Sequence, residues 1–128
     1  MLTYHNPMDL PPPSNLISQA IEVAPGARWL YISGQIAVRP DGTVVEGVEA
    51  QMEDIWKKIL CILESAGMGY ENLVKIGIFL TCEEDILTFR EVRDRVLSGV
   101  KPASTLLIVK GLARPDLLVE IEAVAAAA

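Results

Sequence analysis

The chain has 128 residues, 51% of them hydrophobic, and its 17 acidic and 11 basic residues give a formal net charge of -6. This length suits a single domain, residues 1–128, that buries roughly two thirds of its unfolded surface. The acidic charge opposes binding to a phosphate backbone, so we expect no nucleic-acid partner. Neither a signal peptide nor a run of ~20 apolar residues is found, so we expect a cytoplasmic protein with no membrane partner.

The first third of the chain carries short β-forming segments separated by turns and prolines. Residues 2–5 are predicted as an edge strand, and residues 6–14 as an extended loop, because prolines there lack an amide hydrogen. Residues 19–23 and 29–35 are predicted strands. A glycine inside the second of these, Gly34, predicts a β-bulge or a close backbone approach.

Two features follow before the middle of the chain, a hairpin and a long helix. Residues 36–38 and 43–45 flank a Pro-Asp-Gly turn and are predicted to pair as a hairpin. Residues 48–66 have an apolar stripe at helical spacing and are the clearest predicted helix. Gly67 follows at the position where a helix end favours positive φ.

The second half of the chain continues with a strand, a helix and two strands. Residues 73–80 alternate as a strand does, and residues 84–97 are predicted as a helix that starts with a Thr81-x-x-Glu84 capping box. Residues 105–109 and 117–126 are the last predicted strands. The first of these two is continuously apolar, which predicts cover on both of its faces.

The last strand places two carboxylates on one side of the sheet. Glu120 and Glu122 project with Leu118 and Val124, whereas the intervening apolar residues project to the other side. Two helices can cover only one face of a five- or six-stranded sheet. The face carrying the carboxylates, together with Leu106 or Leu107, is therefore predicted to be covered by another subunit.

The residue inventory excludes several kinds of chemistry. His5 is the only histidine, so neither a Ser–His site nor a multi-histidine metal site can form within one chain. Cys61 and Cys82 do not form a CxxC motif and have no positioned base, so we expect two reduced, unreactive thiols. We therefore expect no metal site.

Five segments together identify a family resemblance. They begin at Asn15 (Asn-Leu-Ile-Ser-Gln-Ala-Ile), Tyr31 (Tyr-Ile-Ser-Gly-Gln-Ile), Gly67, Pro102 (Pro-Ala) and Val119 (Val-Glu-Ile-Glu-Ala-Val-Ala). In this order and at these separations they resemble the Rid family, the reactive-intermediate deaminases, also called the YjgF or endoribonuclease L-PSP family. The resemblance extends over nearly the whole chain.

This resemblance implies a fold, an assembly and a reaction. The fold is α+β and chorismate-mutase-like, with an approximately six-stranded mixed sheet and two helices packed on one face. Three chains form a homotrimer with a central barrel and with small-molecule clefts between subunits. Active members hydrolyse 2-imino or 2-enamino acids to 2-keto acids and ammonia without metal or cofactor, so we expect no cofactor here.

The resemblance assigns the water-handling side of the site to matching residues. Glu120 corresponds to the carboxylate that orients the hydrolytic water. Ser33 and Gly34 match the Ser-Gly-Gln turn and are expected to bind the substrate, although a serine in a bulge also fits a hydrogen bond to its own backbone. The alternative for Glu120 is a carboxylate satisfied by backbone amides or by a subunit contact. Glu122 is expected to be structural.

The substrate-binding side departs from the family pattern. The arginine that holds the substrate carboxylate is replaced by Ser104, next to Thr105, and the family's tyrosine, asparagine and cysteine correspond to Ile17, Arg90 and Leu106. Serine cannot act as a charge partner for a carboxylate as arginine does. The chain is therefore expected to be a divergent member with an altered substrate.

Several hypotheses remain open from the sequence. Arg90 is a candidate replacement for the missing arginine, although it equally fits a solvated helix face, and Arg114 is a second candidate. The protein is either an imine or enamine deaminase or a trimer that binds a small molecule or partner without turnover. Ribonuclease activity is disfavoured by the acidic charge and the absence of a histidine pair.

Overall fold

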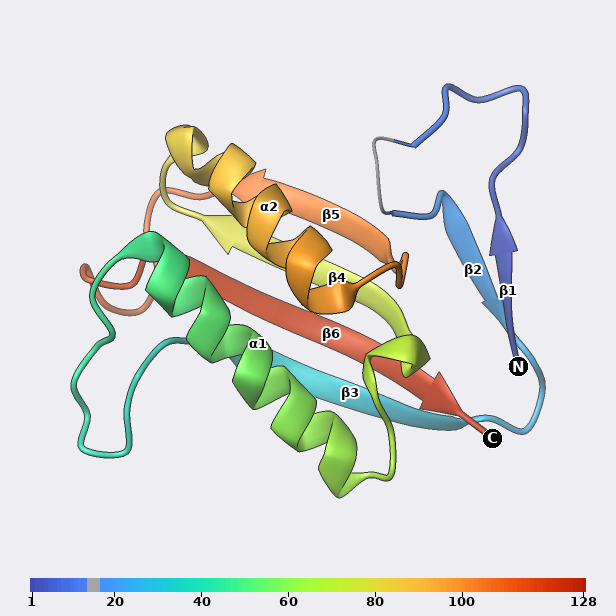
Figure 1. Cartoon of the computed structure of the whole chain (residues 1–128), viewed down its shortest axis with the longest axis horizontal. Coiled ribbons are helices and arrows are strands. Elements are labelled where there is room, and N and C mark those ends of the chain that lie inside the picture. Colours follow the sequence, from blue (N-terminus) through green and yellow to red (C-terminus); the bar gives the residue numbers. More distant parts are fainter. Residues whose placement is uncertain (14–16) are drawn as a thin grey trace.

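The computed structural model describes residues 1–13 and 17–128, and its centre is a four-stranded mixed sheet with the strand order β3-β6-β4-β5 (Figure 1). β6 lies antiparallel between β3 and β4, and β4 pairs with β5 in parallel. The elements are β1 Leu2–His5, β2 Ala20–Val23, β3 Arg28–Gln35, α1 Val48–Ser65, β4 Leu73–Leu80, α2 Ile86–Leu97, β5 Ala103–Ile108 and β6 Val119–Ala127. The expected α+β fold is confirmed.

The expected six strands are present, but they form two sheets. β1 and β2 pair with each other as a separate antiparallel ribbon, which extends away from the main sheet (Figure 1). The segment just before β2 is hydrogen-bonded to the segment just before β5. There the Ser18 amide donates to the Pro102 carbonyl at 3.2 Å, and the Ser18 hydroxyl donates to the Lys101 carbonyl at 2.6 Å. A two-stranded ribbon buries little apolar area, so the four-stranded sheet carries the core.

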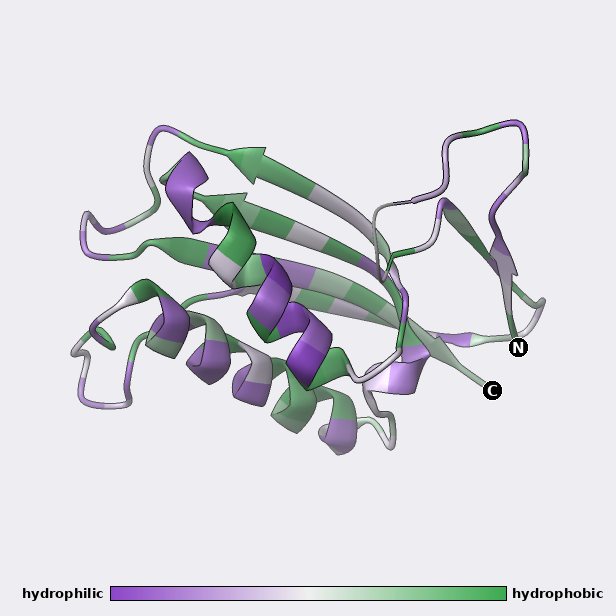
Figure 2. Ribbon diagram, turned by 45° about the horizontal axis from the view of Figure 1, so that its top comes forward, coloured by the Kyte–Doolittle hydropathy of each residue, from purple (hydrophilic) through white to green (hydrophobic). Residues whose placement is uncertain are grey.

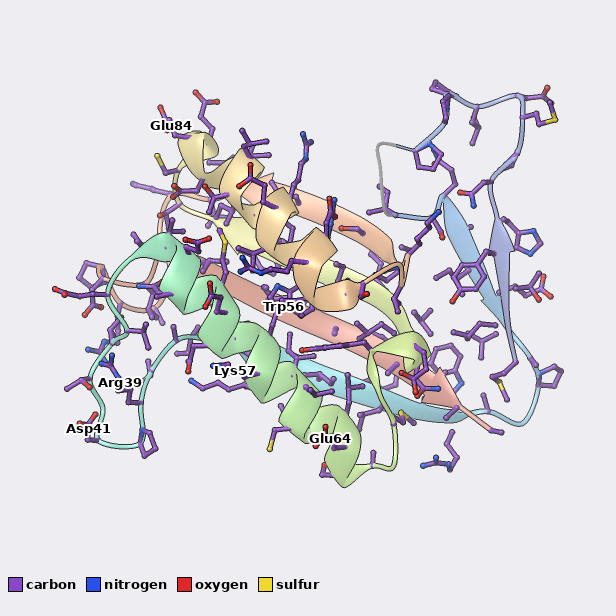
Figure 3. All side chains as sticks on the ribbon, in the orientation of Figure 1. Arg39, Asp41, Trp56, Lys57, Glu64 and Glu84 are labelled. Atoms are coloured by element: carbon purple, nitrogen blue, oxygen red, sulfur yellow. The ribbon has the colours of Figure 1, made fainter. Side chains whose placement is uncertain are left out.

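Both helices pack on the same face of the main sheet, as expected from the number of elements (Figure 1). Figure 2 shows hydrophobic and hydrophilic residues alternating along the helices above largely hydrophobic strands. Met52, Ile55, Ile59 and Leu63 of α1 are fully buried against Ile76, Ile78 and Ile121 of the sheet. Trp56 is also buried and lies between the two helices (Figure 3), where the Tyr70 hydroxyl donates to its carbonyl at 2.7 Å.

The glycine predicted at the end of the first helix is confirmed, whereas the capping box predicted at the start of α2 is wrong. Gly67 follows α1 with φ +70°, as expected. The capping box at Thr81 and Glu84 does not form, because Glu84 accepts from the Cys82 thiol at 2.6 Å instead, and a 3-10 turn at Glu83–Asp85 precedes α2. The hairpin predicted for residues 36–38 and 43–45 is present only as one antiparallel bridge between Val38 and Val44, and its two segments do not form strands.

β5 is an edge strand, and within the single chain one of its faces is covered by the helices; the cover predicted on its other face, from another subunit, stays a prediction. Leu106 turns toward the helices and packs at the edge of the core, whereas Leu107 is 50% exposed on the opposite side. Ile108 is exposed as well. Along β6 the predicted alternation is confirmed: Val119 and Ile121 are buried under the helices, and Glu122 faces outward.

No helix within the described part of the chain is long and apolar enough to span a bilayer.

Candidate functional site

A cavity of about 320 Å³ lies beside α2, at the edge of β5, and it gathers four of the positions singled out from the sequence. Ile17, Arg90, Ser104 and Leu106 all line it. Its remaining walls come from α2: Ile86, Phe89 and Arg93. The size lies at the lower end of the range for small-molecule pockets.

Strand alternation decides which residues of β5 reach this cavity. Ser104 and Leu106 are two residues apart and therefore share the helix-covered side. Thr105 points to the other side, where its hydroxyl accepts a hydrogen bond from Lys75 Nζ at 2.7 Å. Thr105, a candidate substrate-binding residue, is thus not brought to the cavity, whereas Ser104 is.

The cavity also contains an arginine that the sequence analysis missed. Arg93 is only 5% exposed, its guanidinium carbon lies 5.9 Å from the centre of the Phe89 ring, and its Nε donates to Oδ1 of Asp94 at 2.9 Å. Arg90, one turn earlier, is exposed at the rim. The helical spacing of Arg93 could have predicted its burial, because Arg93 lies four residues from both Phe89 and Leu97 on the buried side of α2.

The helix-free face of the sheet carries Glu120, the expected water-handling residue, and Ser33 and Gly34, two of the expected substrate-binding residues. β3 has a register irregularity between Ile32 and Gln35, which confirms the bulge predicted around Gly34. A Cβ atom on Gly34 would overlap Oε2 of the half-buried Glu120, so the predicted close approach is a carboxylate lying over this glycine. Ser33 is exposed beside it, and its carbonyl accepts from Gln35 Nε2 at 2.9 Å.

The same face carries a second carboxylate and uncovered aromatic rings. Glu122 lies over Gly77 of β4, where an added Cβ would be 3.0 Å from the Glu122 Cγ. Trp29 and Tyr31 stack with their ring centres 6.4 Å apart, and they are 49% and 76% exposed. An exposed apolar patch of this kind on a sheet face is typical of an association surface.

The sequence-predicted residues thus fall into two groups on opposite faces of one sheet. Ile17, Arg90 and Ser104 lie beside α2, whereas Glu120 and the Ser33–Gly34 turn lie on the helix-free face. Within one chain the carboxylate and the cavity are separated by the sheet itself.

Arg114 belongs to neither group. Its guanidinium donates to the Gly42 carbonyl at 2.9 Å and lies 3.5 Å from Oδ2 of Asp116, in the loop before β6. It lines a separate hollow with Thr81, Lys110 and Leu117. The structure therefore does not bring Arg114 to the cavity in place of the missing arginine.

The cysteines and the histidine lie away from both groups. Cys61 and Cys82 are free and exposed. The hydrogen bond to Glu84, at the N-terminal end of α2 (Figure 3), raises the pKa of the Cys82 thiol, which disfavours the nucleophilic thiolate. His5 lies 3.3 Å from Glu22 on the β1–β2 ribbon, and no metal-binding cluster of three His, Cys, Asp or Glu residues occurs in residues 1–13 and 17–128.

The mixed sheet with both helices on one face is a fold shared with solved structures of Rid family proteins. The endoribonuclease L-PSP family model matches residues 9–127, and the chain belongs to this family. A RutC family protein of Aquifex aeolicus is 40% identical over 121 residues, covering 90% of this chain and 91% of that protein.

Other relatives include proteins with more specific names and with solved structures. A mouse protein named 2-iminobutanoate/2-iminopropanoate deaminase is 34% identical over 110 residues, 84% of this chain and 78% of that protein. The crystal structure of YyfB, a Rid family protein of unknown function from Yersinia pestis, superposes with a TM-score of 0.86 at 27% identity, covering 97% of each chain. RidA of an Antarctic Psychrobacter gives a TM-score of 0.73 at 33% identity over 90% of this chain and 91% of that one.

Proposed function

We propose that this protein hydrolyses an imine or enamine metabolite to a carbonyl compound and ammonia, in clefts between the subunits of a homotrimer. In each cleft the cavity beside α2 of one subunit meets Glu120 from a neighbour. The observation that carries this proposal is the separation of the two residue groups by the sheet, because only a second chain can bring Glu120 to the cavity.

The helix-free face supports association through its composition. Trp29, Tyr31 and Leu107 expose large apolar surfaces there. Burying such side chains is favourable by about 25 cal/mol per Å² of apolar area, which favours covering this face with sister chains. A sheet face packed at the centre of a trimer also places Glu120 at a subunit boundary.

The chemistry requires few groups because an imine carbon is already electrophilic. Glu120 accepts a hydrogen bond from water and takes its proton as the water oxygen bonds to the imine carbon, while the C=N electron pair moves to nitrogen; Glu120 then returns this proton to the nitrogen, which gives the carbinolamine. Glu120 next takes the hydroxyl proton of the carbinolamine and passes it to the amine nitrogen, so that the C–N bond breaks with its electron pair on nitrogen, the carbonyl forms and ammonia leaves. One water is consumed, one carbonyl and one ammonia are formed, and the Glu120 carboxylate is regenerated.

The substrate differs from that of a typical family member. Ser104 occupies the position that the family resemblance gives to an arginine, and Ile17 and Leu106 make the cavity more apolar than a tyrosine and a cysteine would. The mouse relative named an iminobutanoate and iminopropanoate deaminase supports the reaction type. The altered cavity favours an imine with a different side chain or anionic group.

The proposal is tested with an imine generated in situ. Native protein and Glu120→Gln are incubated with the enamine that a threonine dehydratase or an amino-acid oxidase releases. The rate of imine loss in each sample is compared with the rate without added protein. Light scattering measures the molar mass of each sample. The proposal is supported if the native trimer accelerates the loss of imine and the Glu120→Gln trimer does not.

A second outcome supports the binding alternative. If native trimers bind small carboxylates but do not accelerate imine loss across a panel of amino-acid precursors, the protein is a non-catalytic binding module. This alternative is favoured by one observation, the replacement of the expected arginine by Ser104.

A further inference from the structure

The buried guanidinium of Arg93 is unusual for its position in the fold. It lies on the sheet-facing side of α2 and is 5% exposed, whereas Arg95 two residues later is exposed and pairs with Glu53 at 3.1 Å. Burying an arginine is costly unless its charge is paired and its N–H groups have acceptors. A functional or structural reason for this burial is therefore expected.

The partners of Arg93 within the described residues account for only part of its hydrogen-bonding capacity. Its Nε and Nη2 both approach a single carboxylate oxygen, Oδ1 of Asp94, at 2.9 Å. A guanidinium has five N–H donors arranged to bind a planar anion with two of them at once. Arg93 lines a cavity whose other walls are mainly Ile17, Phe89 and Leu106.

The charge balance of the cavity is positive. Asp94 offsets one of the two arginines, Arg93 and Arg90, and none of the described residues that line the cavity is acidic. A cation in a largely apolar, partly enclosed space attracts an anion more strongly than the same cation in water. Ser104 lies on the opposite wall of the same cavity and can donate one neutral hydrogen bond.

We propose that Arg93, assisted by Arg90, is the anion-binding group of this cavity, so that α2 supplies the charge that strand β5 lacks at Ser104. The ligand class is a small carboxylate whose apolar side chain contacts Ile17 and Leu106. This inference rests on the proposed function, because the cavity is one side of the same cleft. It adds that Arg93 determines specificity for anionic over neutral ligands.

The test measures binding and not turnover. Native protein, Arg93→Met and Arg95→Gln are titrated with 2-oxobutanoate and with its neutral amide by calorimetry. Arg93→Met retains the volume and removes the charge, and we expect it to weaken 2-oxobutanoate binding by roughly thirtyfold or more, since a charge-assisted contact in a shielded site is lost. Amide binding should change little. Arg95→Gln, a charge removed from the same helix outside the cavity, should leave both affinities unchanged.

A rescue variant separates binding from packing. Ser104→Arg placed in the Arg93→Met background restores a guanidinium from the opposite wall and should recover most of the carboxylate preference. Thermal unfolding and molar mass confirm that each variant is folded and assembled. If Arg93→Met does not fold, Arg93→Lys, which keeps the charge but loses the two-donor geometry, should still reduce the preference for carboxylate.

Two results would overturn the inference: native protein that binds 2-oxobutanoate no better than the amide, or a folded Arg93 variant with the native preference. Failure of the proposed function gives a different pattern. In that case native protein and Glu120→Gln both bind 2-oxobutanoate with the Arg93 dependence described, and neither hydrolyses an imine.

Discussion

The cavity beside α2 and the helix-free face of the sheet differ in charge and in construction. The cavity is lined by two arginines and apolar side chains, whereas the opposite face presents Glu120 and Glu122, each over a strand glycine. One region has the charge to hold an anion and the other has the carboxylate to orient water. Under the proposed function each chain would hold two half-sites, and assembly would make them adjacent.

The most disruptive way to test this comparison is to prevent assembly. Tyr31→Glu places a charge on the helix-free face at a side chain that is 76% exposed in the single chain. We expect trimers to dissociate and imine hydrolysis to be lost, because burying an unpaired carboxylate between subunits is costly. Sedimentation and the imine assay measure the two effects.

A matched control uses the outer side of α2. Leu87 is 66% exposed there, so Leu87→Glu makes a similar change of an exposed apolar residue to a charge. It should keep the native mass and activity. A Tyr31→Glu protein with the native mass would contradict the placement of the interface on the helix-free face.

The next test removes the carboxylate chemistry alone. Glu120→Gln keeps the shape of the side chain, and we expect the rate of imine hydrolysis to fall about a hundredfold or more, in the range for loss of a general base. Glu122→Gln, two residues along the same strand and over a different glycine, should retain most of the activity. Equal losses in both variants would indicate a shared electrostatic role on this face instead of one water-orienting residue.

A smaller effect is expected from crowding the carboxylate without removing it. An alanine Cβ at position 34 would overlap Oε2 of Glu120, so Gly34→Ala forces the carboxylate to rotate away. The end of a flexible side chain can move at little cost, so the stability should change little while activity falls about tenfold through misplacement of the base. Thermal unfolding and initial rates measure both quantities.

The control for this substitution is Gly77→Ala. It makes the same change under Glu122, where the nearest side-chain atom lies 3.0 Å from the added Cβ. Activity at or near the native level is expected. A comparable loss in Gly77→Ala would show that general crowding of the face, and not the position of Glu120, limits the rate.

The sequence was most informative where periodicity is strong. The alternation along β6 correctly placed Glu120 and Glu122 on one face, and the glycine within β3 predicted the irregular register observed between Ile32 and Gln35. These features depend on neighbours one or two residues away or on a missing side chain, which a single sequence records directly. The family resemblance then supplied the positions that meet in the cavity.

Features that depend on distant packing were not predictable in the same way. β1 and β2 form a sheet of their own, and the segment before β2 is joined to the segment before β5 through the hydrogen bond from Ser18 to Lys101, which lies 83 residues away in sequence. Arg93 was overlooked because a basic residue near a helix end is usually solvated there. Its spacing of four residues from both Phe89 and Leu97 on the buried side of α2 is the signal that would have predicted its burial.

The smallest predicted effect compares two adjacent residues of β5. Ser104 faces the cavity, whereas Thr105 accepts a hydrogen bond from Lys75 on the other side of the strand. A neutral hydrogen bond contributes about 0.5–1.5 kcal/mol, so Ser104→Ala should weaken 2-oxobutanoate binding by roughly threefold to tenfold. Thr105→Ala should leave that affinity unchanged, because its side chain is separated from the cavity by the strand itself. Calorimetry on these two variants, changed at neighbouring residues, therefore tests whether the ligand binds on the helix-covered side of the sheet. A larger loss of affinity in Thr105→Ala than in Ser104→Ala would place the ligand on the opposite face.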